Sequence, residues 1–183
     1  MANTVSRSLH DVGLSAWFGG TLANAVGLNK AAAEANGNGG SGAVANEGWD
    51  RWTPVNAAAI GLHLAGSVGQ LAGNTERLKA QKGVGTMALV KTGLTAAALG
   101  ATAYSRMLGQ KVSQHHDVPV ESGTEPSAET PTQVAKAQRQ LDVLQWVVPA
   151  ITGALVVISS FAGEQQRPHR VADGISARLR RRG

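Results

Sequence analysis

His63 and Lys91 are the residues whose chemical type and position point most directly to chemistry. Each lies inside a long stretch that otherwise lacks Asp, Glu, Lys and Arg. Ionisable groups are costly to bury in hydrocarbon, so intramembrane ones are candidates for function. For Lys91 the favoured interpretation is an anchor whose long stem reaches back to the headgroups. For His63 it is a neutral imidazole that is hydrogen-bonded to a neighbouring Ser, Thr or Asn, and a proton relay or a haem ligand is the alternative.

The other histidines are weaker candidates for a haem or metal site. A bis-histidine haem needs a second histidine at matching depth, and the span boundaries predict that His10 lies at the cytoplasmic edge while His63 lies near the midplane. The predicted depths therefore argue against haem. His115, His116 and Asp117 form a local cluster, but neighbouring histidines in a polar loop make a poor metal site, so no metal is expected.

No catalytic constellation is present in the sequence. There is no cysteine, which excludes thiolate nucleophiles, disulfides and sulfur-based zinc sites. Neither a Ser-His-Asp order nor a phosphate-binding or dinucleotide-binding fingerprint occurs, and Asp11 and Glu76 stand at predicted helix ends rather than in a cleft. We expect no enzyme activity and no cofactor.

Four stretches with little or no charge are each close to the ~20 residues that cross a bilayer. They are residues 12–29, 52–75, 83–105 and 143–163, and only the last is strongly hydrophobic. Charged residues make up 16% of the chain, where a soluble domain carries about a quarter. The prediction is an all-α integral membrane four-helix bundle over residues 1–166, followed by a basic cytoplasmic tail at 167–183.

Small residues recur every four positions in these stretches, which lets helix backbones approach closely. This spacing predicts packing faces that join helices within the bundle or between molecules. The residues concerned are Gly19, Ala23 and Gly27 in the first stretch, and Gly61, Ala65, Gly69 and Gly73 in the second.

The distribution of basic residues predicts the orientation. With both termini in the cytoplasm, ten Lys and Arg residues face inside and six face outside. The same orientation places Trp49, Trp52, Tyr104 and Trp146 at outer helix ends, where amphipathic rings favour the headgroup level. A multi-pass protein of the cytoplasmic membrane follows as the expected location.

The connectors and the tail are polar. Residues 36–45 (NGNGGSGAVA) and the acidic, proline-bearing stretch from Gln110 to about Pro131 predict flexible outer loops, and the fourth helix is expected to extend outward to Thr132. Arg178, Arg180, Arg181 and Arg182 crowd the C-terminus, where a short amphipathic helix would face anionic lipid.

The segment SLHDVGLSAWFGGTLANAVGLNKAA (8–32), with four spans and a basic C-terminus, resembles small actinobacterial membrane proteins of unassigned function. The resemblance implies a location and no site residues. The leading hypothesis is a structural or accessory membrane protein that associates with itself or with another membrane protein. Two alternatives stay open: a small transporter or proton-conducting bundle using His63 and Lys91, and a soluble helical bundle whose basic tail binds nucleic acid.

Overall fold

The protein is all-helical in this computed structural model, which describes residues 2–35, 40–75, 83–115 and 118–164. Its four long helices are α1 (Ala2–Ala23), α3 (Gly40–Gly73), α5 (Val84–Ser113) and α6 (Thr132–Glu164). A π-helical segment, η1 (Asn24–Leu28), and the short α2 (Asn29–Ala33) continue α1. The basic tail lies outside the described residues.

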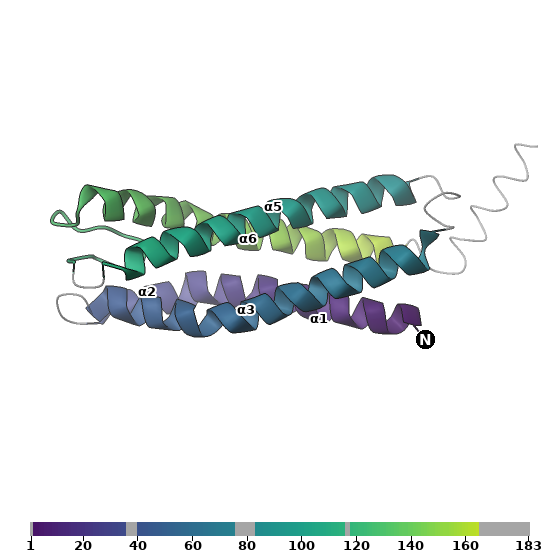
Figure 1. Cartoon of the computed structure of the whole chain (residues 1–183), viewed down its shortest axis with the longest axis horizontal. Coiled ribbons are helices and arrows are strands. Elements are labelled where there is room, and N and C mark those ends of the chain that lie inside the picture. The colour runs from purple at the N-terminus through teal and green to yellow at the C-terminus, as the bar shows by residue number, and fades with distance from the viewer. Residues whose placement is uncertain (1, 36–39, 76–82, 116–117, 165–183) are drawn as a thin grey trace, which may run out of the picture.

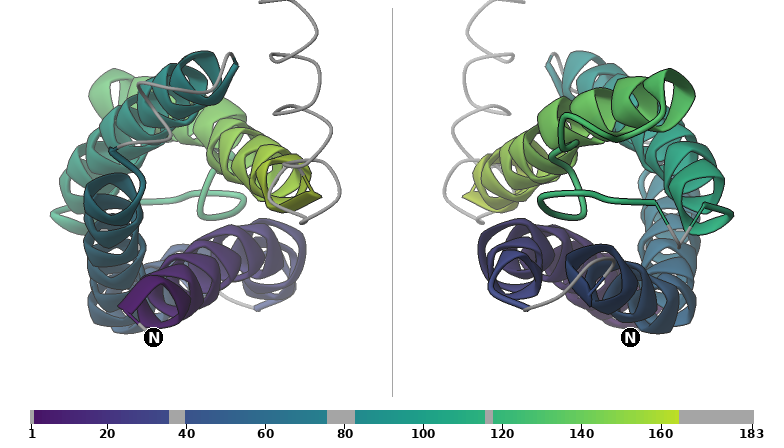
Figure 2. Two further views of the ribbon diagram at one scale, coloured as in Figure 1. Left: turned by 90° about the vertical axis from the view of Figure 1, so that its right-hand side faces the viewer. Right: turned by 90° about the vertical axis from the view of Figure 1, so that its left-hand side faces the viewer.

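The four long helices run up and down along one axis and form an elongated bundle (Figure 1). Viewed along that axis, they surround a common centre (Figure 2). Helix α1 packs against α3 and α6, and α5 packs against α6, whereas α3 and α5 make only a few contacts with each other. The start of α1 and the end of α6 lie at the same end of the bundle, where Gly163 approaches the Arg7 side chain.

Two apolar clusters form the core. Near the middle of the bundle, Trp17, Ala59 and Ala98 are buried together, so one large ring fills the space between small residues. Towards the loop end, α5 and α6 join through the buried Leu108, Val112, Val134 and Ala137. The predicted third span ends at 105, but α5 continues to Ser113. The last turns of α5 are polar overall, yet they bury an apolar stripe in this second cluster, which explains the longer helix.

Helix α6 begins at Thr132, which confirms the prediction that the fourth helix extends to this residue. The prediction of a flexible connector at residues 36–45 is wrong for its second half, because α3 begins at Gly40. Ser41 donates a hydrogen bond to the Ala35 carbonyl at 3.3 Å, and Ala45 is buried against Gly123. The small residues that suggested flexibility instead allow close packing.

The described part of the long outer loop, 118–131, is also packed, which corrects the prediction of a disordered loop. Ser122 and Thr124 are buried, and Gln138 of α6 donates a hydrogen bond to the Ser122 carbonyl at 2.9 Å. The Ser122 hydroxyl accepts hydrogen bonds from two backbone N–H groups of the same turn. Short polar side chains therefore satisfy the loop backbone locally.

Candidate functional site: a buried histidine pair

Two glycines bring α1 and α3 into backbone contact. A Cβ atom on Gly13 would collide with the backbone of Ala59 and His63, and one on Gly66 would collide with the backbone of Ser6 and His10. Each glycine therefore lies against the helix turn that carries the other helix's histidine. Only glycine allows so close an approach.

This crossing places the rings of His10 and His63 against each other in the interior of the bundle. Their centroids are 4.6 Å apart and their planes are inclined by 48°. His10 is 1% exposed and His63 is not exposed at all. The Trp17 ring meets His63 edge-on at 6.0 Å and closes the site towards the middle of the bundle.

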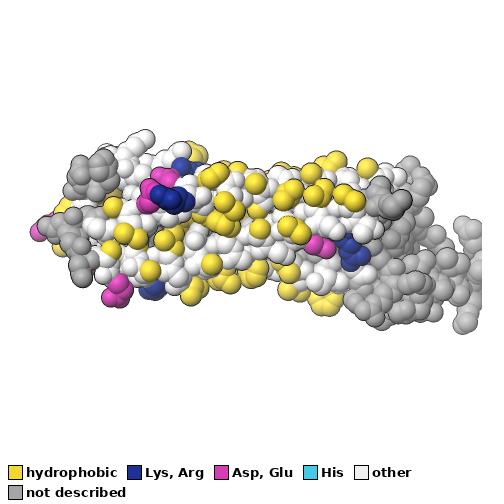
Figure 3. Space-filling model, turned by 90° about the horizontal axis from the view of Figure 1, so that it is seen from below, with side chains coloured by type: hydrophobic (Ala, Val, Ile, Leu, Met, Phe, Trp, Pro, Cys, Tyr) yellow, Lys and Arg dark blue, Asp and Glu magenta, His cyan; other side chains and the backbone are white. Residues whose placement is uncertain are grey.

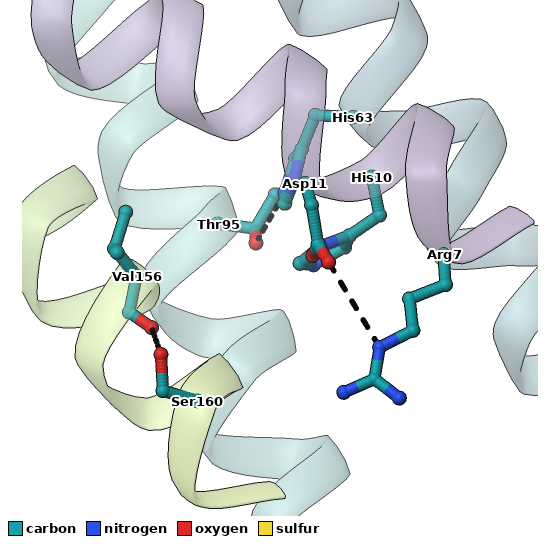
Figure 4. A network of polar contacts seen from close by, with 7 residues as sticks. All are labelled: Arg7, His10, Asp11, His63, Thr95, Val156 and Ser160. Carbon is teal, nitrogen blue, oxygen red and sulfur yellow. Dashed lines mark hydrogen bonds and ion pairs between the residues drawn. The ribbon is translucent and has the colours of Figure 1, made fainter. Parts of the chain in front are cut away.

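Each histidine has one polar partner (Figure 4). His10 Nδ1 lies 2.7 Å from Asp11 Oδ1, and because a carboxylate only accepts, this nitrogen is the donor. His63 Nε2 lies 3.3 Å from the Thr95 hydroxyl on α5. Within the described residues, His10 Nε2 and His63 Nδ1 are buried and have no hydrogen-bond partner. The pair thus combines satisfied and unsatisfied ring nitrogens.

Charges of both signs border the pair. Asp11 is half exposed and lies 3.9 Å from Arg7 one turn earlier (Figure 4). Lys91 of α5 is half buried and interacts electrostatically with Asp11 and with both histidines. Lys91 is therefore placed beside the polar cluster that His63 belongs to.

The structure overturns the predicted separation of His10 and His63. Sequence reasoning placed His10 at a boundary because the apolar stretch begins at Val12, but α1 begins at Ala2 and crosses α3 at Gly13. Although His10 and His63 lie at the same level of the bundle, the structure does not support a haem between them. A metal ion needs about 2 Å to each ligand nitrogen, and two rings in direct contact leave no room for one between them.

The remaining predicted residues lie elsewhere. Gly19, Ala23 and Gly27 are exposed, as are Gly61, Ala65 and Gly73. Gly69 approaches Ser6 of α1, whereas nothing lies within 4 Å of a Cβ atom added at Gly19, Gly27 or Gly61. Contact of these faces with a second molecule stays a prediction. His115 is exposed, His116 and Asp117 fall outside the described residues, and the described part of the chain holds no metal-ligating group of three. Arg178, Arg180, Arg181 and Arg182 also fall outside it.

Sequence reasoning missed His10 as the neighbour of His63 and Asp11 as the partner of His10; it predicted a Ser, Thr or Asn partner for His63 without singling out Thr95. A signal for the first is present: His10 and Gly13 are separated by two residues, and His63 and Gly66 repeat the pattern. Residues three apart share a helix face, so each helix offers a histidine beside a gap that the other can enter. Thr95 has no comparable signal, because threonine is frequent in apolar helices.

Comparison with known proteins gives no family. No family model, no curated protein and no solved structure matches the chain. The site therefore rests on its own geometry.

Proposed function

We propose that the chain is an integral protein of the cytoplasmic membrane that crosses it with four helices and serves as a structural or accessory component. The observation that carries this proposal is the distribution of side chains between surface and interior. Large apolar residues are exposed on all four long helices, among them Val5, Val12, Val55, Val68, Leu89, Met107, Val143, Val157 and Phe161. Exposed large apolar side chains on every long helix are expected where lipid surrounds the bundle.

Polar residues share the interior with the two apolar clusters. The buried residues include His10, His63, Asn56, Gln138 and Thr152. On the face that α1 and α3 present in Figure 3, charged side chains lie towards the two ends, and hydrophobic or uncharged side chains cover the middle. This arrangement suits a hydrocarbon surrounding, where helices associate through polar and small residues.

Helices α5 and α6 are long and apolar enough to cross a membrane, by length and composition, and among the described residues they are the only ones. A core helix of a soluble protein meets the same criterion but is mostly buried. Here 6% of the apolar window of α5 and 22% of that of α6 is buried. The low burial favours lipid as the solvent for both.

Helices α1 and α3 do not meet this criterion among the described residues, and buried polar residues help to explain why. Thr21 on α1, and Asn56 and His63 on α3, are all buried. A criterion based on hydropathy counts these residues although lipid would not meet them. From Trp52 to Gly73 helix α3 carries no charged residue, a length of about 33 Å, which matches the hydrocarbon core.

The expected orientation keeps both termini in the cytoplasm, since α1 begins and α6 ends at the same end of the bundle and most basic residues belong to that side. Carbonate extraction tests the location: the protein is expected in the membrane pellet. Recovery in the supernatant would favour the soluble, nucleic-acid-binding alternative. Reporter fusions that placed the 114–131 connector in the cytoplasm would refute the orientation.

Association is the functional part of the proposal. The exposed faces with Gly19, Ala23 and Gly27, and with Gly61 and Ala65, offer close approach to a second copy or to another membrane protein. Cross-linking in mild detergent is expected to give a specific oligomer or partner. Ala65→Leu should weaken it, whereas Ala96→Leu, exposed on α5, should not. A monomer without a co-purifying protein would contradict this role.

A proton-conducting bundle is a second candidate, and the histidine pair favours it. Two buried imidazoles in contact join Asp11, on the half-exposed side, to Thr95 inside the bundle, and each ring keeps one nitrogen without a partner. Imidazole takes up and releases protons near neutral pH. In liposomes, His63→Leu should abolish a pH-driven flux and the exposed His115→Leu should not. No flux in the unaltered protein would eliminate this candidate.

A further inference from the structure

A cavity of about 310 Å³ lies in the loop-side half of the bundle, between α3 and α5. These two helices make only a few contacts with each other, and side-chain hydrogen bonds join them on either side of this space. His63 meets Thr95 beyond one end of the cavity, and Asp50 accepts a 2.7 Å hydrogen bond from Arg106 at the other. The cavity is therefore a held-open gap between two helices.

Its walls are mainly apolar. Ile60 of α3, Leu99 of α5, and Leu144 and Val148 of α6 contribute to the lining. Small-molecule sites have volumes from about 300 Å³ upwards and combine such walls with a few polar groups. In size and lining the cavity resembles a binding site.

Two polar atoms of the lining have no hydrogen-bond partner within the described residues: Asn56 Oδ1 and Trp52 Nε1. Asn56 is 9% exposed, so its oxygen is removed from solvent. The two residues are four positions apart on α3 and share a face of the helix. One atom accepts and the other donates, and a hydroxyl group offers the chemistry that both need because it donates one hydrogen bond and accepts others.

The ligand is expected to be uncharged. Among the described residues of the lining, Asp50 and Arg106 are the only charged ones, and they pair with each other. A phosphate or an ammonium group would find no free counter-charge, and burying it would be costly. The lining of the cavity thus favours an apolar ligand that carries a hydroxyl group.

We propose that this cavity binds the hydroxyl-bearing end of a neutral lipid, whose acyl chains leave between α3 and α5. The choice of a lipid rests on the proposed membrane location, since the bilayer supplies such molecules at the side of the bundle. The inference concerns a site remote from the histidine pair.

Native mass spectrometry of the detergent-solubilised full chain with 1,2-dioctanoylglycerol tests the site. One bound molecule per chain is expected. Ala57 lines the cavity and Ala58 does not, while both are exposed, so Ala57→Phe should reduce binding at least tenfold and Ala58→Phe should leave it unchanged. Equal binding by both variants, or none by the unaltered chain, would overturn the proposal.

The hydroxyl is tested with 1,2-propanediol dioctanoate, which lacks only that group. The unaltered chain should bind it about three- to tenfold more weakly, the range expected for neutral hydrogen bonds. Asn56→Leu replaces the amide with an apolar group of similar shape. This variant should show a smaller difference in affinity between the two probes. Identical affinities for the two probes in the unaltered chain would mean that water, not a lipid hydroxyl, satisfies Asn56 and Trp52.

The outcome is separable from that of the membrane proposal. If carbonate released the protein, binding would be measured without detergent, and retained discrimination between the probes would still support the cavity site. If the chain stayed in the membrane pellet but bound neither probe, the lipid site would be refuted and the membrane location would stand.

Discussion

At the residue scale, two glycines decide where the histidines meet. Gly13 and Gly66 are the positions at which α1 and α3 come closest beside His10 and His63, and any side chain there would strike backbone rather than a flexible group. The histidine pair is thus a consequence of backbone approach. Thr95 then fixes the orientation of one ring from a third helix.

Gly66→Ala should lower the free energy of unfolding by about 1–3 kcal/mol, the usual cost of overpacking a tight contact. Gly61→Ala on the same helix is the matched control, because nothing lies within 4 Å of its added methyl group. Alanine there should be neutral or stabilise by up to about 1 kcal/mol. Unfolding in mixed detergent micelles measures both, and equal stability of the two variants would contradict the crossing geometry.

Thr95→Val should also destabilise the protein, by about 1 kcal/mol or more, because His63 Nε2 then has no partner in a buried site. Thr92→Val is the comparison: Thr92 is exposed, and its hydroxyl bonds only to the Ala88 carbonyl of its own helix. The same unfolding assay should show little change for it. If Thr95→Val matched Thr92→Val, the hydrogen bond to His63 would contribute nothing to stability.

At the element scale, the sequence predicts where the helices lie along the chain better than it predicts how they pack against one another and against the loop. Charge-free stretches locate all four long helices, and helix formers after Pro131 locate the start of α6. The depth of His10 was not predictable from Val12, because the helix extends past the apolar stretch and its register against α3 is set by Gly13. The packing of the loop was not predictable, because an acidic, proline-rich composition does not indicate the hydrogen bond from Gln138.

Gln138→Ala is expected to loosen the outer loop, since it removes the side chain that holds the Ser122 carbonyl. A glutamate-specific protease should then cut faster after Glu121 and Glu129, both of which are exposed. Gln133→Ala, at an exposed position near the start of the same helix, should leave the cleavage rate unchanged. Equal rates in the two variants would show that Gln138 does not order the loop.

At the scale of the whole molecule, large apolar residues are exposed on all four long helices, and the interior holds two separate features beside its apolar clusters. The histidine pair lies between α1 and α3 near the end that carries both helix termini, and the cavity lies between α3 and α5 on the loop side. Trp17 separates them and donates a hydrogen bond to Thr102, which lines the cavity. Each feature suits a protein whose solvent is lipid.

Nitroxide accessibility tests that claim most directly, because the chain has no cysteine and single labels are clean. Leu62, on α3 beside His63, is 39% exposed, and Ala128 is exposed in the outer loop. In bilayers, a label at Leu62→Cys should collide more with oxygen than with a water-soluble nickel chelate, and a label at Ala128→Cys should do the reverse. A Leu62 label as open to the nickel chelate as the Ala128 label would contradict the membrane-embedded bundle.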